Sequence, residues 1–176
     1  KIISGIEWCV NNASLFNISA ISMSLGLISY KNTTYCDSSD NPLLVDSIHD
    51  AINKNISVIV ASGNDGSSPL GVSSPACISN VTVVGSTTKS DAISSFSDLW
   101  SLPMLLAPGE DIISTYSNGF AAFSGTSMAT PHVAAAFALI HQYFKLTENR
   151  VIMPNETQRY LNDTGKQITD SNGLVF

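Results

Sequence analysis

A serine between a glycine-containing loop and a small-residue apolar run is the residue best placed for chemistry in this sequence. Ser127 lies in the stretch SGTSMATPH, and a largely apolar segment follows it as far as Ile140. Gly125 permits a close approach of the backbone, and Pro131 is tolerated only near the beginning of a helix. The pattern predicts a helix whose first turn runs from Ser127 to Pro131, with its free N–H groups and positive dipole end beside the serine.

Two interpretations of Ser127 follow from this position. A serine here is ordinarily a helix cap, whose oxygen accepts an N–H of the first turn. If Ser127 is instead a nucleophile, an oxyanion would form beside it, and the backbone N–H of Ser127 would stabilise that oxyanion. Spacing alone favours the cap. The alanine- and valine-rich residues after Pro131 predict a helix that is packed on all sides.

The elements that must position this serine alternate between helical and strand-length patterns. One helix is expected close to residue 1, and a second begins with Asn41 as its cap and Pro42 in its first turn. Apolar runs of strand length occupy residues 19–26, 56–63, 81–87, 103–109 and 111–117. Near-continuous apolar strands are buried on both faces, so the order predicts a parallel α/β sheet.

In parallel sheets the ligand site lies beyond the carboxyl ends of the strands. The loops after Met23, after Ile59 and before Ser127 are therefore expected to converge there. Polar loops cover residues 28–40 and 64–75, and a polar tail follows the last helix.

Length and composition exclude several classes of partner. A chain of 176 residues with 44% apolar residues is enough for one well-buried domain. Its net charge of −6 leaves no broad basic face, so we expect no nucleic-acid partner. No apolar stretch approaches the roughly 20 residues that span a bilayer, so we expect no membrane partner.

The three cysteines allow at most one internal bridge. No Cys-x-x-Cys spacing occurs, which weakens zinc and redox interpretations. Cys36 and Cys77 fall in loops beyond neighbouring strands, and we expect them to pair, although spacing leaves the unpaired state open. Cys9, on the apolar face of the first helix, is expected to be a buried free thiol.

Four stretches resemble subtilisin-like serine proteases, and they occur in the order of that family. GTSMATPHVAAAFALI resembles the nucleophile motif, ISMSLG the substrate-pairing strand, ASGNDG the oxyanion loop, and LLAPGEDIIST the segment before the nucleophile. The similarity covers residues 1–145, with a weaker echo in LNDTGKQITDSNGL. It implies a single domain over 1–176, with a three-layer subtilisin-like fold that is incomplete at its N-terminal side.

The resemblance also implies residue roles. Ser127 would be the acyl-accepting nucleophile, and the Asn64 amide with the Ser127 N–H would bind the oxyanion. An extended peptide or protein substrate would lie between two walls, with small residues at the pocket floor and one acidic residue at its rim. One wall would be formed by Ser24, Leu25 and Gly26, and the other by Ala61, Ser62 and Gly63. Ser73 and Ser74 would form the floor of the pocket, and Asp65 would lie at its rim.

The general base and its orienting acid are not found in the family's positions. None of the three histidines, His49, His132 and His141, lies in a His-Gly-Thr-His motif; His49 is expected to be exposed in mid-helix, and His132 to point away from Ser127. The Asp-Thr-Gly at 163–165 follows the serine, where the family has a terminal helix-to-turn segment. The resemblance therefore implies that both groups belong to an upstream part of the same domain and that this chain alone is inactive.

Two further expectations come from the resemblance. Met104 stands where the family often has a calcium-binding aspartate, and a thioether is a poor ligand for a hard cation. We therefore expect no metal in this chain, calcium only at sites upstream of it, and no other cofactor. The family is typically secreted, so we expect an extracytoplasmic location, with which a disulfide would agree.

Other functions remain open. A peptide-binding pseudoenzyme could keep this half of the fold after its base had decayed. A sedolisin-type acid protease shares a Gly-Thr-Ser motif but places an aspartate where Asn64 stands. An α/β-hydrolase would require Gly-x-Ser-x-Gly, which GTSMA does not match.

Overall fold

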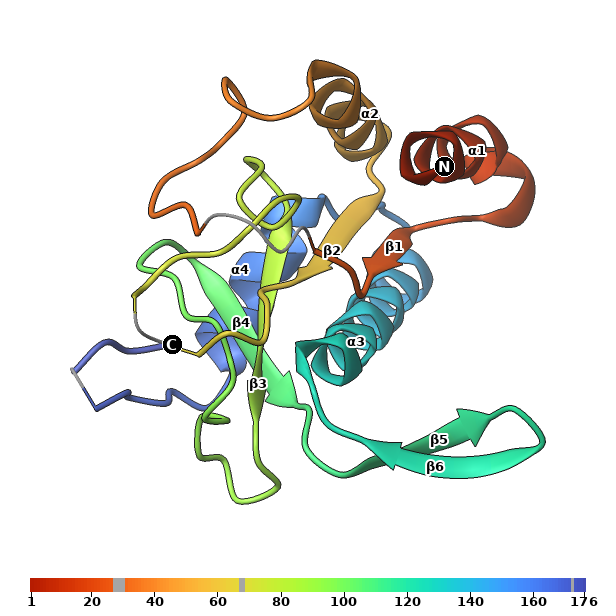
Figure 1. Ribbon diagram of the computed structural model, residues 1–176. Helices are drawn as coiled ribbons and strands as arrows, with labels where there is room; N and C mark the ends of the chain where they lie inside the picture. The colour runs from red at the N-terminus through yellow and green to blue at the C-terminus, as the bar shows by residue number, and fades with distance from the viewer. Residues whose placement is uncertain (27–30, 67–68, 172) are drawn as a thin grey trace.

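A four-stranded parallel sheet forms the centre of the computed structural model, which describes residues 1–26, 31–66, 69–171 and 173–176 (Figure 1). The strand order is β1-β2-β3-β4, and every neighbouring pair is parallel. The strands are Ala20–Met23 (β1), Ser57–Ala61 (β2), Thr82–Thr87 (β3) and Met104–Pro108 (β4). The predicted α/β class is confirmed.

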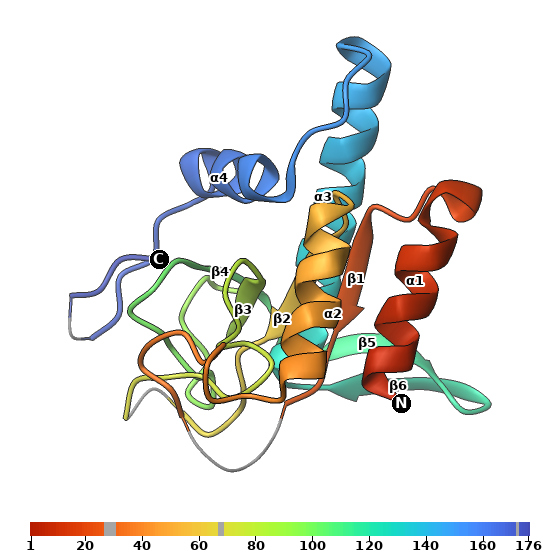
Figure 2. The same ribbon diagram turned by 90° about the horizontal axis from the view of Figure 1, so that it is seen from above.

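Helices cover both faces of this sheet and give three layers. Helices α1 (Ile2–Phe16) and α2 (Pro42–Asn53) lie side by side on one face (Figure 2). Helix α3 (Thr126–Thr147) contacts all four strands from the other face, and α4 (Pro154–Thr164) packs against α3.

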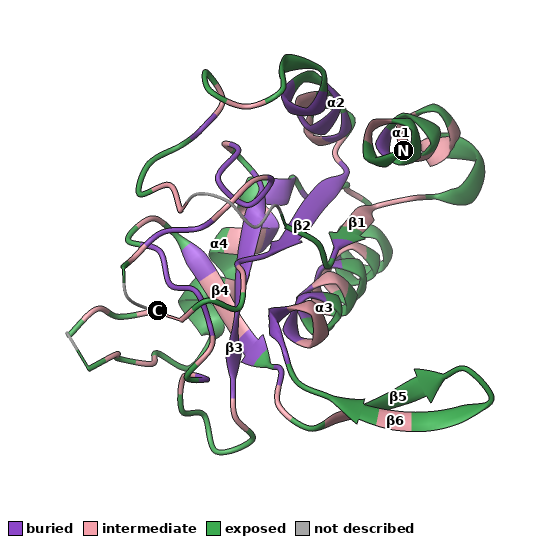
Figure 3. Ribbon diagram, in the orientation of Figure 1, coloured by how far each residue is buried: buried purple, intermediate pink, exposed green. Residues whose placement is uncertain are grey.

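The core follows from strands that are apolar on both faces. Every residue of β2 and β3 is buried (Figure 3). Because side chains alternate along a strand, Val58 and Val60 pack into the cluster beneath α1 and α2, whereas Ile59 packs with Phe137 of α3. Each fully buried side chain of this size stabilises the fold by about 1.5–3 kcal/mol, so the sheet is a rigid support for the loops at its ends.

The helix starts agree with the sequence, with one shift. The Asn41 side chain accepts the N–H of Leu43 at 3.0 Å, and Pro42 is the first residue of α2, as predicted. Helix α3 begins at Thr126 with Gly125 as its cap, one residue earlier than predicted. The cap is therefore a glycine, and Ser127 is free for another role.

A hairpin stands apart from the parallel sheet. Strand β5 (Ile112–Tyr116) pairs antiparallel with β6 (Gly119–Phe123), and the two project from the body of the molecule (Figure 1). The β-like run over 111–117 was predicted, whereas β6 was not. Most of the hairpin is exposed (Figure 3).

The predicted burial of α3 and of Cys9 is wrong. Helix α3 is not packed on all sides, because Ala135 and Ala138 are exposed on the face turned away from the sheet, where no described residue covers them. Cys9 is half-exposed, since its helix lies at the edge of the layer, although it is a free thiol as expected. The predicted Cys36–Cys77 disulfide is confirmed, and both of its residues are buried.

Some predicted segments fall outside the described residues. These are positions 28–30 of the first predicted loop, positions 67–68 of the second, and Asn172 in the tail. Within the described ranges, no helix has the length and apolar character to cross a membrane.

Candidate active site

Three loops converge at the carboxyl ends of β1 and β2, as predicted. They enclose a cavity of about 310 Å³. It lies between the residues that follow β1, those that follow β2, and the start of α3. Its lining residues are Ser24, Leu25, Gly26, Ala61, Gly63, Asn64, Asp65, Ser73, Thr126 and Ser127.

Asn64 is bound to the first turn of α3 through its carbonyl oxygen. Its Oδ1 accepts the backbone N–H of Thr126 at 2.9 Å and the Thr126 hydroxyl at 3.0 Å. The amide nitrogen is near Gly125, where a Cβ atom would lie 3.4 Å from Nδ2. Neither Asn64 Nδ2 nor the backbone N–H of Ser127 has a hydrogen-bond partner among the described residues. The two residues that carry these N–H donors, Asn64 and Ser127, both line the cavity.

Pro131 explains a contact between the cavity wall and the serine. Proline has no N–H to donate to the carbonyl four residues earlier, and that carbonyl belongs to Ser127. The hydroxyl of Ser24 donates to it instead, at 2.8 Å. The proline thus frees an acceptor on the serine residue, and the loop after β1 binds to it.

Two serines expected at the pocket do not line it. Ser62 is buried, and it points to the opposite side of the chain from Ala61 and Gly63 because side chains alternate in extended backbone. Ser74 is also absent from the lining, while Ser73 contributes to it. The expected second wall is therefore made by Ala61 and Gly63 alone.

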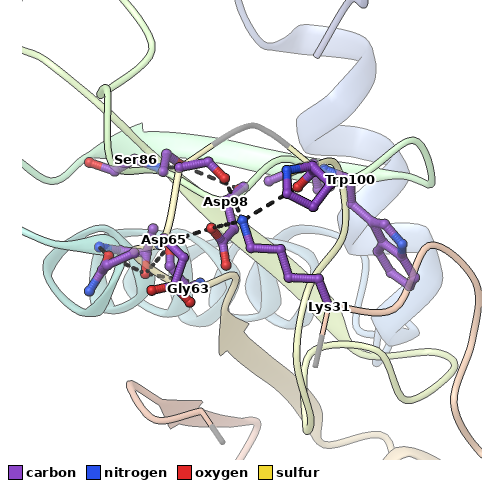
Figure 4. Close-up of polar contacts among 12 residues, drawn as sticks. Lys31, Gly63, Asp65, Ser86, Asp98 and Trp100 are labelled. Atoms are coloured by element: carbon purple, nitrogen blue, oxygen red, sulfur yellow. Dashed lines mark hydrogen bonds and ion pairs between the residues drawn. The ribbon is translucent and has the colours of Figure 1, made fainter. Parts of the chain in front are cut away.

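A buried ion pair lies beneath the loop after β2, and sequence reasoning missed it. Lys31 Nζ lies 2.8 Å from Asp98 Oδ1, and the Asp98 side chain is fully buried (Figure 4). Burial raises the pKa of the Asp98 carboxyl above its ordinary value, although the Lys31 ammonium acts in the opposite direction. A weak signal was an aspartate directly before two large apolar residues in SFSDLW, and nothing in the spacing connects it with position 31.

None of the histidines lines the cavity. His132 Nδ1 contacts the Met128 carbonyl at 2.8 Å, so the ring is held against its own helix, and His132 lines a different cavity from Ser127. Burial lowers the pKa of His141, and its Nε2 has no partner in the described part of the chain. Among the described residues, therefore, no histidine lies at the cavity that Ser127 lines.

His49 is half-buried, not exposed as expected, because it contacts the loop after Cys77. Its Nε2 lies 3.2 Å from Asp37 Oδ1 and 3.2 Å from Ser79 Oγ. A serine, a histidine and an aspartate meet here, but both partners contact the same ring nitrogen. A proton relay requires the two nitrogens to face different partners, so this cluster joins loops rather than activating a nucleophile.

One group of potential metal ligands comes together among the described residues. It consists of Cys36, Asp40 and Cys77. The two sulfur atoms form the disulfide, so they are not available to an ion. Met104 is buried, and its sulfur accepts the N–H of Trp100 at 3.3 Å.

Comparison with protein families matches residues 1–174 to the Subtilase family. The chain belongs to the subtilase family. Alkaline serine exoprotease A of Vibrio alginolyticus is 35% identical over 99% of this chain and 30% of its own length. Thermostable alkaline protease of Halalkalibacterium halodurans is 36% identical over 99% of this chain and 44% of its own length. The subtilase chain thus spans less than half of these relatives.

Solved structures agree with the family. The crystal structure of a cold-adapted subtilisin-like serine proteinase matches with a TM-score of 0.77 and 35% identity, over 98% of this chain and 57% of the other. The structure of the prenylagaramide maturation protease PagA matches with a TM-score of 0.81 and 25% identity, over 98% of this chain and 59% of the other. The predicted subtilisin-like fold is confirmed.

Proposed function

We propose that this subtilase chain carries the nucleophile and the oxyanion hole of a serine endopeptidase. The observation that supports this most is the placement of Asn64. Its carbonyl is bound to Thr126, directly before Ser127, and both Asn64 and Ser127 line the same cavity at the start of α3. A carboxamide and a helix N-terminus beside one hydroxyl suit a reaction in which negative charge develops on a carbonyl oxygen.

The reaction follows from these groups. Ser127 Oγ attacks the carbonyl carbon of a peptide bond and gives its proton to a general base. The oxygen that becomes negative receives hydrogen bonds from the Ser127 N–H and from Asn64 Nδ2. The amine leaves with a proton, the acyl group remains on Ser127, and water then releases it.

The base and its acid are proposed to come from an upstream part of the same domain. The described residues bring no histidine to the cavity, and this chain covers only 57% of the cold-adapted proteinase that it resembles. The 176-residue chain by itself is then inactive.

The substrate is proposed to be a peptide segment in extended conformation. Gly26 and Gly63 border the cavity, and residues without side chains allow a substrate backbone to approach on both sides. Small lining residues favour apolar side chains in the pocket, and Asp65 at its edge favours some tolerance of basic ones.

Calcium and location are also proposals. Met104 at the position of the family's aspartate does not fit a hard cation, so any calcium would bind upstream. We place the protein outside the cytoplasm. The minor extracellular protease Epr of Bacillus subtilis, 36% identical, and the buried Cys36–Cys77 disulfide support this location.

Labelling with a fluorophosphonate tests the proposed function. We expect no labelling of the 176-residue chain and stoichiometric labelling at Ser127 in a longer form that includes the upstream part. Asn64→Leu in the longer form should lower kcat, because it removes one of the two oxyanion donors. In subtilisin, removal of such a donor lowers kcat about 10²–10³-fold. Ser127→Ala is the unlabelled control.

Two results would change the proposal. Labelling of the 176-residue chain would show that the base lies within it. A longer form that binds peptides but neither reacts nor hydrolyses them would indicate the pseudoenzyme.

A further inference from the structure

The turn that carries Asn64 is bound from beneath by one short segment of chain. Asp98 Oδ1 accepts the N–H of Asp65 at 3.0 Å, and the N–H of Asp98 binds the Gly63 carbonyl at 3.0 Å (Figure 4). The N–H of Gly66 donates to the Phe96 carbonyl at 2.8 Å. The residues on both sides of Asn64 are thus fixed by residues 96–98, between β3 and β4.

The Lys31 ammonium completes this arrangement. It lies 2.8 Å from Asp98 Oδ1, its side chain is only 14% exposed, and it also donates to the Gly66 carbonyl. One cation therefore compensates the buried carboxylate and binds the far end of the same turn. A carboxylate with no exposed area would be costly without such a partner.

The second carboxylate oxygen restricts the turn sterically. A Cβ atom on Gly63 would overlap Asp98 Oδ2, and Gly63 has a φ of +123°. Asp98 Oδ2 has no hydrogen-bond partner within the described ranges. The carboxyl group is thus packed against the backbone of the turn at one oxygen and hydrogen-bonded to it at the other.

We propose that Asp98, with Lys31 as its counterion, is a positioning residue for the oxyanion hole, because it fixes the backbone on both sides of Asn64 and so directs Nδ2 into the cavity. Asp98 does not line the cavity and touches no reacting atom. Its effect passes through the Asp65 N–H and the Gly63 carbonyl. This inference rests on the proposed function.

Two double variants separate the hydrogen bond from the charge. K31M/D98N and K31M/D98L both remove the ion pair and keep a side chain of similar shape, but only asparagine can accept from the Asp65 N–H. Replacing a buried ion pair by neutral groups of similar volume is often tolerated, so both should fold. Asp91→Asn, which breaks the exposed Lys166–Asp91 pair, is the matched surface control.

In the longer, catalytically complete form, K31M/D98L should lower kcat by about tenfold to a hundredfold, the scale of a misplaced catalytic group. KM should change by less than about twofold, because the cavity walls remain. K31M/D98N should recover most of kcat, and Asp91→Asn should leave it unchanged. Equal kcat in both double variants, or a change confined to KM, would overturn the proposal.

Nuclear magnetic resonance of the 176-residue chain tests the positioning without any activity. K31M/D98L should speed hydrogen exchange at the Asp65 amide about tenfold or more and shift the Asn64 side-chain amide resonances. K31M/D98N should leave both near the parent values. Unmoved Asn64 resonances in K31M/D98L would contradict the proposal.

The kinetic and the NMR measurements together distinguish a failure of the proposed function from a failure of the positioning proposal. If the longer form never hydrolyses peptides but K31M/D98L shifts the Asn64 side-chain amide resonances, the proposed function is wrong and the proposal that Asp98 positions Asn64 is supported. If K31M/D98L does not fold, K31M/D98S replaces it, because the shorter serine side chain withdraws the acceptor with a smaller change in polarity and leaves no buried charge unpaired; unchanged Asn64 side-chain resonances in that variant would overturn the proposal.

Discussion

Asn64 uses the two ends of its side chain differently. The carbonyl oxygen accepts two hydrogen bonds from Thr126, so the side chain is fixed against α3. The amide nitrogen has no hydrogen-bond partner among the described residues, so it is the end of the side chain that remains available to the proposed oxyanion. A sedolisin-type acid protease would place an aspartate at position 64, so the asparagine found there argues against that alternative.

Gly63 is the residue in this turn that tolerates change least. We expect Gly63→Ala to destabilise the fold by about 2–4 kcal/mol, because its φ of +123° is unfavourable for alanine and the added Cβ would overlap Asp98 Oδ2. The measurement is the free energy of unfolding in urea. Gly5→Ala in α1 is the matched control, since nothing lies within 4 Å of its added Cβ. It should stabilise by about 0.5–1 kcal/mol; equal effects at the two sites would refute the argument.

At the scale of elements, the sequence predicted what depends on local pattern. Asn41 and Pro42 mark the start of α2, the apolar runs mark β2 and β3, and the loops at their ends meet because parallel strands share one edge. Asn64 and Ser127 came together for that reason.

Features that depend on distant partners were missed or wrong. Strand β6 lacks a pattern of its own and exists because it pairs with β5. Lys31 and Asp98 are far apart in sequence and meet only once the sheet has formed. The exposure of His49 depended on Asp37 and Ser79, which no helical periodicity could indicate.

Helix α3 also carries a pH-dependent contribution to stability through His141. Burial lowers the pKa of this histidine, so the unfolded chain binds a proton that the folded chain binds less well. The contribution of His141 to the free energy of unfolding is therefore fully present above about pH 6.5, the ordinary pKa of a histidine, and is lost as the pH falls below that value. The slope should lie well below the roughly 1.4 kcal/mol per pH unit of one full proton, because the residue is only partly buried.

His141→Gln tests this contribution. The free energy of unfolding, measured by denaturant titration between about pH 7.5 and 5.5, should decline less steeply in the variant than in the parent chain. Parallel slopes for the parent and His141→Gln would exclude the assignment.

At the scale of the whole molecule, two elements that meet the candidate active site have a side that no other described residue covers. Strand β1 is an edge of the parallel sheet, with one row of backbone groups unpaired among the described residues. The outer face of α3 exposes large apolar side chains, including Leu139 and Leu146 at 66% and 75%. Both elements reach the candidate active site at one end, since β1 leads into Ser24 and α3 begins next to Ser127. The upstream part that would supply a base is expected to cover both surfaces.

Hydrogen exchange can test that expectation. In the longer form, amides on the open edge of β1 and at the outer face of α3 should exchange about tenfold more slowly or better than in the 176-residue chain. Amides where α1 packs on α2 should not change, because these two helices already contact each other in the 176-residue chain. Protection that rises equally everywhere would indicate a general gain in stability. If β1 and α3 exchange at the same rate in both forms, the upstream part folds elsewhere and cannot bring a histidine to Ser127.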